Sequence, residues 1–275
     1  MRINNNITAI NSHRQYGINT NNIGKNVEKL SSGYRVNRAA DDAAGLAISE
    51  KMRAQIRGLN MASKNSQDAV SLVQVAEGGM QTIQDILQRM RELSVQSASD
   101  TNVSLDRQAL HLELRELIDE INQIATTSEF NEMKLLDGTF NGKFIQAGAN
   151  VGQTMSINIA SMSASKLGDK STDLTSLSIT TRAMATVALK NIGDALNDVS
   201  SQRAKLGAYQ NRLEYKIKNL DNSAENISAA ESRIRDADMA KMMTEFTKNN
   251  ILFQASTAML AQANALPQGV LQLLG

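Results

Sequence analysis

The chain has 275 residues, of which 41% are hydrophobic, and 29 Lys and Arg stand against 28 Asp and Glu. The formal net charge of +1 offers no broad basic field for nucleic acid or anionic lipid. The absence of cysteine excludes disulfides, cysteine nucleophiles and thiolate metal sites. With one proline, no tryptophan and 3% aromatic residues, the core must be built from Leu, Ile, Val, Met and Ala, as in packed helices.

The opening segment, residues 1–26, does not resemble a cleaved secretory signal, because it lacks an apolar run followed by a small-residue cleavage site. No run approaches about 20 apolar residues, so no membrane insertion is expected. If the protein leaves the cell, we expect a route that needs no cleaved signal. The same segment has no formal charge between Arg2 and Arg14, and Ile3, Ile7 and Ile10 share one helical face.

Three long helices are predicted from apolar residues spaced three and four apart. The first covers about 43–98, with Asp41 or Asp42 as its N-terminal cap, and ends at the "SASDTN" segment. The second follows at once, and the third begins after position 185. The stripe of the second helix is Leu110, Leu114, Leu117, Ile121 and Ile124, and that of the third is Ile192, Val199, Leu206, Leu213, Ile217, Leu220, Ala224, Ile227 and Ile234. Stripes of this kind bury one another only side by side, as in a long-helix bundle.

Between the second and third helices the pattern changes. Asp137-Gly138 and Asn141-Gly142 are turn signals, and "TMSINIA" alternates as strands do, so one or two β-hairpins are predicted within 130–160. Residues 161–182 are rich in Ser and Thr and predict an exposed loop or small cap.

The closing segment has no charged residue after Lys248. One apolar column contains Leu252, Met259, Leu266 and Leu273, with Ser256, Ala263 and Val270 four residues after the first three; a second column contains Phe246, Phe253, Leu260 and Leu274. A single partner helix covers one such seam, so the other column would stay in water. Pro267 predicts a bend or break near residue 266.

This surface has three possible explanations. A membrane-surface helix would normally carry Lys or Arg on its polar face, and none follows Lys248. Burial in the molecule's own core remains open, but it does not readily explain why both ends are apolar on several sides. The favoured inference is that the two ends pair with each other and then pack against copies of themselves, becoming ordered only on assembly.

Five stretches together resemble bacterial flagellin, in the order of that family: residues 29–80 ("KLSSGYRVNRAADDAAGLAISEKMRAQIRGLNMASKNSQDAVSLVQVAEGGM"), 87–99 ("LQRMRELSVQSAS"), 127–138 ("TSEFNEMKLLDG"), 199–220 ("VSSQRAKLGAYQNRLEYKIKNL") and 226–252 ("NISAAESRIRDADMAKMMTEFTKNNIL"). The resemblance covers about 1–145 and 185–275. Within it, Glu132 stands where the family often has Gly after "FN".

The resemblance implies a mainly α fold: a long-helix rod or coiled-coil bundle with a small β-hairpin region and discontinuous domains built from both ends of the chain. Residues 1–40 with 236–275 would form an inner coiled-coil domain, 41–160 with 183–235 a rod domain with hairpins, and 161–182 a short outer loop in place of large outer domains. The inner-wall packing residues would be Ile3, Ile7, Ile10, Leu252, Met259, Leu260, Leu266, Val270 and Leu273.

By the same resemblance, the protein is expected to be exported unfolded through the flagellar secretion channel and to polymerise into the extracellular flagellar filament that drives motility. Its expected partners are copies of itself, the export apparatus, an export chaperone and the filament cap. A hook–filament junction subunit or another export-linked coiled-coil protein remains the alternative. Arg89, Leu93 and Glu113 match the family's epitope for a vertebrate innate immune receptor.

No catalytic chemistry, cofactor or metal site is expected. His13 and His111 are the only histidines, and HExxH, GxGxxG and phosphate-loop motifs do not occur. Adjacent acidic residues such as Asp41 and Asp42 do not face each other on a helix and are better interpreted as helix-start charges. Ser and Thr within 161–181 are candidates for O-linked glycan, with an unmodified loop as the alternative.

Overall fold

The computed structural model describes the backbone of residues 6–168 and 173–274, and the side chains of residues 6–168 and 173–266. The chain forms two compact units, one from residues 1–55 and 225–275 and the other from 56–224. The first is called the terminal unit and the second the central unit. Two helices contribute to both units: α2 (Ala43–Ala98) and α4 (Arg182–Arg235). The expected mainly α fold with two small hairpins is confirmed.

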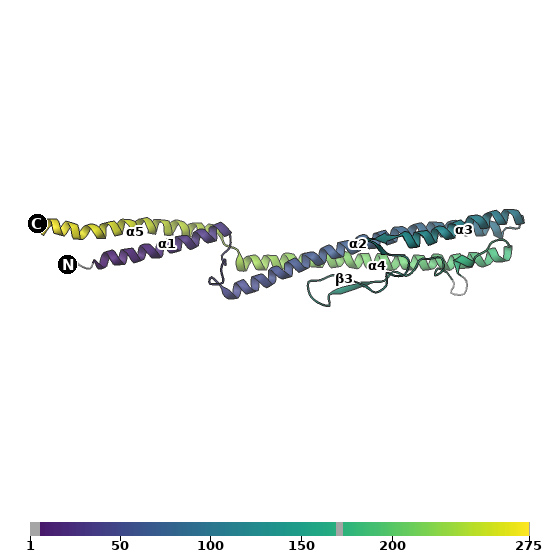
Figure 1. Ribbon diagram of the computed structural model, residues 1–275, viewed down its shortest axis with the longest axis horizontal. Coiled ribbons are helices and arrows are strands. Elements are labelled where there is room, and N and C mark those ends of the chain that lie inside the picture. The colour runs from purple at the N-terminus through teal and green to yellow at the C-terminus, as the bar shows by residue number, and fades with distance from the viewer. Residues whose placement is uncertain (1–5, 169–172, 275) are drawn as a thin grey trace. The chain divides into compact units, whose positions relative to one another are not determined.

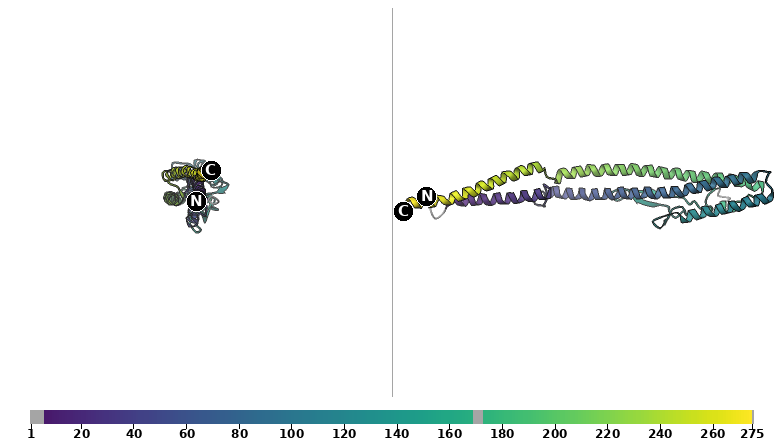
Figure 2. Two further views of the ribbon diagram at one scale, coloured as in Figure 1. Left: turned by 90° about the vertical axis from the view of Figure 1, so that its left-hand side faces the viewer. Right: turned by 90° about the horizontal axis from the view of Figure 1, so that it is seen from above.

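In the terminal unit, α1 (Ile7–Ser32) lies antiparallel beside α5 (Met239–Leu274) (Figure 2). Gly33 ends α1 in the left-handed conformation (φ 73°), which glycine adopts without a Cβ clash. The N-terminus of α2 is capped by Asp42, as predicted, because its Oδ1 accepts the Gly45 N–H at 2.8 Å. Asp41 instead orders the connecting segment by accepting the N–H groups of Asn37 and Arg38.

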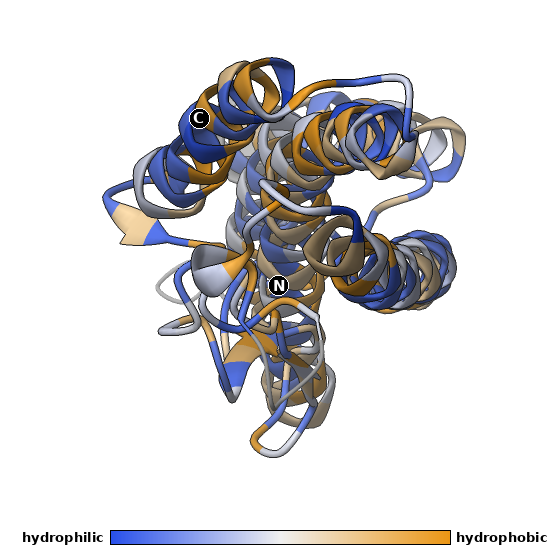
Figure 3. Ribbon diagram, turned by 90° about the vertical axis from the view of Figure 1, so that its right-hand side faces the viewer, coloured by the Kyte–Doolittle hydropathy of each residue, from blue (hydrophilic) through white to orange (hydrophobic). Residues whose placement is uncertain are grey.

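In the central unit, α2 and α4 pack together with α3 (Ser104–Thr127) (Figure 1). Their buried stripes meet in one core that includes Met80, Leu87, Leu114, Ile192 and Leu206. Each helix carries both apolar and polar stretches (Figure 3), as an amphipathic helix does when only one side faces a core. Of the predicted stripe on α3, Leu114 and Ile121 are fully buried, whereas Leu110, Leu117 and Ile124 are only partly covered. Because Ile118 and Ala125 are buried as well, the core-facing side of α3 is centred between these two and the Leu114–Ile121 pair.

Two antiparallel hairpins follow α3. β1 (Glu129–Phe130) pairs with β2 (Met133–Lys134), and β3 (Lys143–Gln146) pairs with β4 (Thr154–Ile157). The predicted hairpins are confirmed, but neither predicted turn signal connects paired strands. Gly138 and Gly142 have positive φ in the segment between β2 and β3, whereas the hairpin turns lie at 131–132 and 147–153.

Of the exposed loop or small cap predicted over 161–182, the exposed loop is wrong for the described part of that segment. Six apolar residues spread along it belong to the buried core: Met162, Ala164, Leu167, Leu174, Leu177 and Ile179. A short 3-10 helix, η1 (Leu174–Ser176), lies within it. Because the apolar residues are separated by Ser, Thr and Lys, the composition concealed a segment that is anchored on one side and solvated on the other.

Of the bend or break predicted near residue 266, the break is wrong, since α5 continues through Pro267. A proline in a helix interior removes one backbone hydrogen bond, which is the bond to the carbonyl four residues earlier. Because α5 is not broken here, the carbonyl of Ala263, four residues before Pro267, needs a donor other than the backbone of residue 267. The proposed domain limits at 40/41 and 235/236 stay a prediction; the compact units themselves divide at 55/56 and 224/225.

Candidate functional site

The contact between α1 and α5 has a heptad pattern on both helices. The covered residues that recur at heptad spacing are Ala9, Ser12, Tyr16, Asn19, Ile23, Asn26 and Leu30 on α1, and Met242, Phe246, Asn249, Phe253, Ser256, Leu260 and Ala263 on α5. Spacings that alternate between three and four place each set on one helix face. We call this face-to-face contact the terminal seam. It is polar at several core positions, which is unusual for a coiled-coil seam.

Specific side-chain contacts hold the terminal seam together. Tyr16 and Phe253 pack with their ring centroids 5.1 Å apart. The Asn19 amide nitrogen donates to Ser256 Oγ at 2.7 Å and lies 3.3 Å from the Leu252 carbonyl oxygen. At the end of the pair, the Asn6 amide nitrogen donates to the Ala263 carbonyl oxygen at 2.7 Å. Packing and hydrogen bonds together define one antiparallel register.

Outside the terminal seam, α1 and α5 expose large apolar side chains. Ile7 and Ile10 on α1, and Leu252, Met259 and Leu266 on α5, have exposed fractions between 41% (Leu252) and 63% (Ile10 and Met259). Ile251 is exposed as well. We call these six residues the outer apolar columns. Leu252, Met259 and Leu266 belong to the first predicted column of the closing segment, and Ile7 and Ile10 belong to the predicted apolar face of the opening segment. Ile251 was not predicted.

The predicted inner-wall residues therefore fall into three groups. Ile7, Ile10, Leu252, Met259 and Leu266 lie in the outer apolar columns. Leu260 lies in the terminal seam, where α1 partly covers it. Ile3 and the side chains of Val270 and Leu273 lie outside the described residues.

Sequence reasoning missed a cluster around Arg235 at the C-terminus of α4. The Arg235 guanidinium lies 4.7 Å from the centroid of the Tyr34 ring and forms an ion pair with Glu50 at 2.5 Å. The Arg235 carbonyl oxygen also accepts the Arg35 N–H at 2.7 Å, and Tyr34 pairs with Asp236 in a β-bridge. These contacts fasten the segment after α1 to the segment before α5. The two arginines in "SRIRDAD", Arg233 and Arg235, were the available signal.

On the central unit, two of the three predicted receptor-epitope residues meet. Arg89 Nη2 and Nε bind the Glu113 carboxylate at 2.9 and 3.0 Å, and Arg89 Nη1 binds Glu92 at 3.0 Å. The hydrogen bond to Glu113, with a smaller contribution from Glu92, raises the pKa of Arg89. Leu93 is only 1% exposed and belongs to the core, so in this conformation it is not a surface contact. The four-residue spacing between Arg89 and Leu93 does not by itself show that Leu93 is buried.

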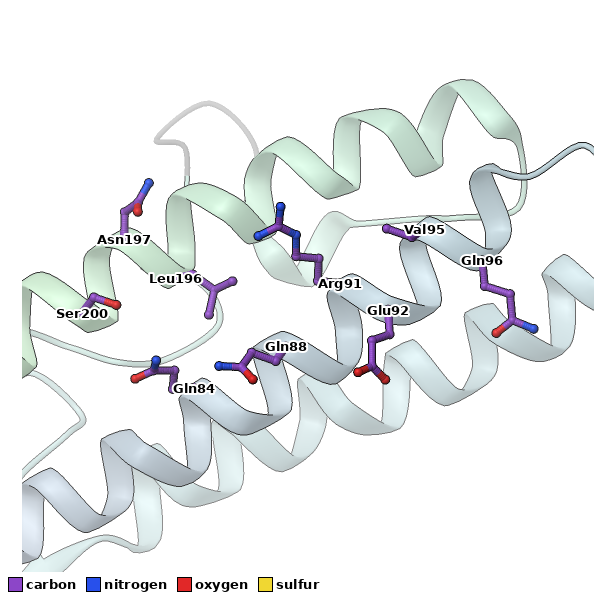
Figure 4. A pocket seen from close by; sticks show the side chains of 9 residues that line it. All are labelled: Gln84, Gln88, Arg91, Glu92, Val95, Gln96, Leu196, Asn197 and Ser200. Atoms are coloured by element: carbon purple, nitrogen blue, oxygen red, sulfur yellow. The ribbon is translucent and has the colours of Figure 1, made fainter.

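A groove of about 660 Å³ lies between α2 and α4 (Figure 4). Gln84, Gln88, Arg91, Glu92, Val95 and Gln96 of α2 line it, with Leu196, Asn197 and Ser200 of α4. Four of these nine residues carry amide side chains, and no paired carboxylates or histidines converge there. The groove has the polarity of a protein contact surface rather than of an apolar ligand pocket.

The described residues contain no group of three or more His, Asp or Glu side chains placed to hold a metal ion. None of the helices, within the part of the chain that is described, has the length and hydropathy needed to cross a membrane. The structural features that remain are the terminal seam, the outer apolar columns and the polar surfaces of the central unit.

These features define a class of mainly α proteins in which the first and last helices pair and the middle of the chain forms a separate helical unit with small hairpins. Residues 3–141 match the model of the bacterial flagellin N-terminal helical region, and residues 189–274 match that of the C-terminal helical region. The chain belongs to the bacterial flagellin family.

Two relatives match the whole chain in sequence, and a solved structure matches part of it. A flagellin of Halalkalibacterium halodurans is 56% identical over 274 residues, covering 100% of both chains. The flagellar filament 30.7 kDa core protein of Treponema maltophilum is 48% identical over 284 residues, again with 100% coverage of both. The crystal structure of Bacillus cereus flagellin has a TM-score of 0.50 and 31% identity, and the match covers 61% of this chain and 94% of that one.

Proposed function

We propose that the α1–α5 pair of this chain, which is a structural subunit of the extracellular bacterial flagellar filament, packs against the α1–α5 pairs of neighbouring copies. Family membership and full-length identity to flagellins support the filament role. The same full-length sequence identity to flagellins disfavours the alternative considered from the sequence, a hook–filament junction subunit. A structural role also agrees with an absence of enzymatic activity, which remains part of the proposal.

The outer apolar columns carry the proposal about packing. Five of their residues were predicted from the sequence as inner-wall residues, and all six are exposed in the single chain. Burying one such side chain contributes about 1.5–3 kcal/mol, so a repeated contact along these columns can drive polymerisation. The closing segment has no charge after Lys248 that would oppose this burial.

The test is polymerisation of the full chain carrying Met259→Gln and Leu266→Gln. We expect the double variant to have an unchanged central unit by circular dichroism and thermal unfolding but no long filaments by electron microscopy. Ala261→Gln is the matched control, because residue 261 is exposed on α5 between two amide residues in its heptad column, Gln254 and Gln268. Normal filaments from the double variant would refute the proposed packing.

The remaining partners belong to the same proposal. We infer passage through the flagellar secretion channel, with an export chaperone inside the cell and a filament cap at the growing end, from the family resemblance. Secretion of a variant lacking residues 1–40 distinguishes this route, since its retention in the cell is expected. Protein exported equally well without that segment would contradict its role.

Recognition by a vertebrate innate immune receptor is a second proposed function, supported by one specific observation. Arg89 and Glu113 form an exposed ion pair between α2 and α3, and their guanidinium and carboxylate groups have further hydrogen-bonding capacity for a partner. Leu93 is proposed to support this surface from within the core.

Glycosylation of Ser and Thr within 161–181 also remains a proposal, for which Ser165 and Ser176 are exposed candidates. The intact mass of the native protein, compared with 29.9 kDa, tests it.

A further inference from the structure

The chain's single proline lies inside a helix, and this creates an acceptor at a defined position. Pro267 has no N–H, so within α5 it cannot donate to the carbonyl of Ala263, four residues earlier. In helix interiors, a proline generally also crowds the carbonyl at that position. The Ala263 oxygen therefore differs from its neighbours along α5, each of which is followed four residues later by a residue with an N–H.

The described structure supplies a donor at this carbonyl. Asn6 lies 257 residues away in sequence, and its side-chain nitrogen donates to the Ala263 oxygen at 2.7 Å. The other end of the same amide caps α1, because Asn6 Oδ1 accepts the Ala9 N–H at 3.1 Å and the Thr8 hydroxyl at 2.6 Å. One side chain thus satisfies the first turn of α1 and the carbonyl left without its helical donor in α5.

A hydrogen bond of this kind can specify the register of α1 against α5, which apolar packing alone does weakly. The terminal seam is built from heptads, and a slide of α1 by seven residues would superpose Ser12 on the place of Asn19, or Asn19 on that of Asn26. Apolar heptads alone discriminate weakly between such registers, and polar residues at core positions commonly specify the register. Pro267 occurs once, so the acceptor that it creates exists in one register only.

We propose that Asn6 and Pro267 are a matched pair that sets the register of α1 against α5. Pro267 creates the acceptor and Asn6 fills it, while the Asn19–Ser256 hydrogen bond reinforces the same alignment. In a filament, neighbouring copies meet through the outer apolar columns, whose alignment across the pair depends on this register. The use in the filament rests on the proposed function, whereas the pairing within one chain does not.

The test is a double-mutant cycle in the full chain with Asn6→Asp, Pro267→Ala and both together. Aspartate remains a good N-cap but cannot donate, so Asn6→Asp separates capping from the bond to Ala263. In the Pro267→Ala background, the new backbone N–H at position 267 can donate to the Ala263 carbonyl. The loss of the Asn6 side-chain donor should then have little effect on the stability of the α1–α5 register. Asn11→Asp, on an exposed position of α1, is the control for added charge.

The readout in the assembled state is the critical monomer concentration for polymerisation. We expect Asn6→Asp to raise it about fivefold to tenfold, the effect of one hydrogen bond, in the natural background. In the Pro267→Ala background we expect a change of less than about twofold. An equal rise in both backgrounds, or no rise in either, would overturn the proposed coupling.

A second readout does not depend on polymerisation. Because the chain has no cysteine, Asn19→Cys with Ser256→Cys introduces one pair of thiols at positions whose side chains are 2.7 Å apart in this register. We expect Asn6→Asp to slow disulfide formation in this double-cysteine chain when Pro267 is present, but not in the Pro267→Ala background. Unchanged disulfide rates in both backgrounds would refute the register role even if no variant forms filaments.

Discussion

Asn131 and Glu132 form the two-residue connection between β1 and β2, and both have positive φ, 48° and 64°. They are the only non-glycine residues with positive φ within the part of the chain that the structure describes. A two-residue hairpin with positive φ at both positions favours Asn followed by Gly, since glycine has no Cβ to clash. Glu132 therefore holds a conformation that costs about 1 kcal/mol or more for a residue with a side chain.

Glu132→Gly should stabilise the central unit by about 1 kcal/mol by relieving this clash. The measurement is the urea or thermal midpoint of the monomer, followed by a signal from the central unit. Glu132→Ala is the matched control, because it removes the same carboxylate but keeps a Cβ. If Ala and Gly gave equal gains, the lost charge rather than the backbone conformation would be the cause.

Because Leu93 is buried and Arg89 is exposed, substitutions at these two predicted epitope residues should have different effects on receptor activation and on stability. Arg89→Ala should weaken receptor activation while leaving the monomer's stability within about 1 kcal/mol, because exposed ion pairs contribute little to folding. Leu93→Ala should instead destabilise the monomer by about 2–5 kcal/mol, because Leu93 is in the core. Receptor-reporter assays and denaturant unfolding of the same preparations distinguish these outcomes. A stable Leu93→Ala protein with lost activation would show that Leu93 contacts the receptor directly.

The core of the central unit allows a direct comparison between two leucines. Leu206 on α4 is fully buried, whereas Leu112 on α3 is 69% exposed. Leu206→Ala should cost about 2–5 kcal/mol of unfolding free energy, and Leu112→Ala less than about 1 kcal/mol. Chemical denaturation of both monomers measures the difference. Similar losses for the two variants would mean that Leu112 is covered in solution.

The long helices could be predicted because their signals are local and repeated. The limits of α2 match the predicted 43–98, since Asp42 caps one end and the Ser-rich segment follows the other. The partly buried segment around 162–179 could not be predicted in the same way. Its six core residues lie among Ser and Thr, and they are buried only through tertiary packing in the core that α2, α3 and α4 share, which a local pattern does not show.

The candidate site shows the same limit. The sequence predicted two apolar columns on α5, but not that Phe246, Phe253 and Leu260 face α1 while Leu252, Met259 and Leu266 remain exposed. That choice depends on which residues of α1 can meet each column, and Tyr16 and Asn19 find partners at Phe253 and Ser256. Likewise, the general rule for proline predicted a bend or break near 266, but it could not predict that the Asn6 side chain donates to the Ala263 carbonyl.

His111 on α3 makes the monomer's stability depend on pH above the range where most carboxylates titrate. Burial, with a smaller contribution from the nearby Arg115, lowers the pKa of His111 below its ordinary value of 6.5. Its Nδ1 atom is buried without a hydrogen-bond partner among the described residues. The unfolded chain therefore binds a proton more readily than the folded one, so stability is present in full above pH 6.5 and decreases as pH falls towards the lowered value.

The variant His111→Gln, which cannot be protonated, should lose less stability than the natural chain between about pH 7.5 and 5.5, an interval that brackets the ordinary histidine pKa. The measurement is the urea midpoint of the monomer at both pH values. His13→Gln, on an exposed position of α1, should keep the natural dependence. If His111→Gln and the natural chain lost equal stability over this interval, other groups would have to account for the pH dependence, and the burial of His111 would have no consequence for folding.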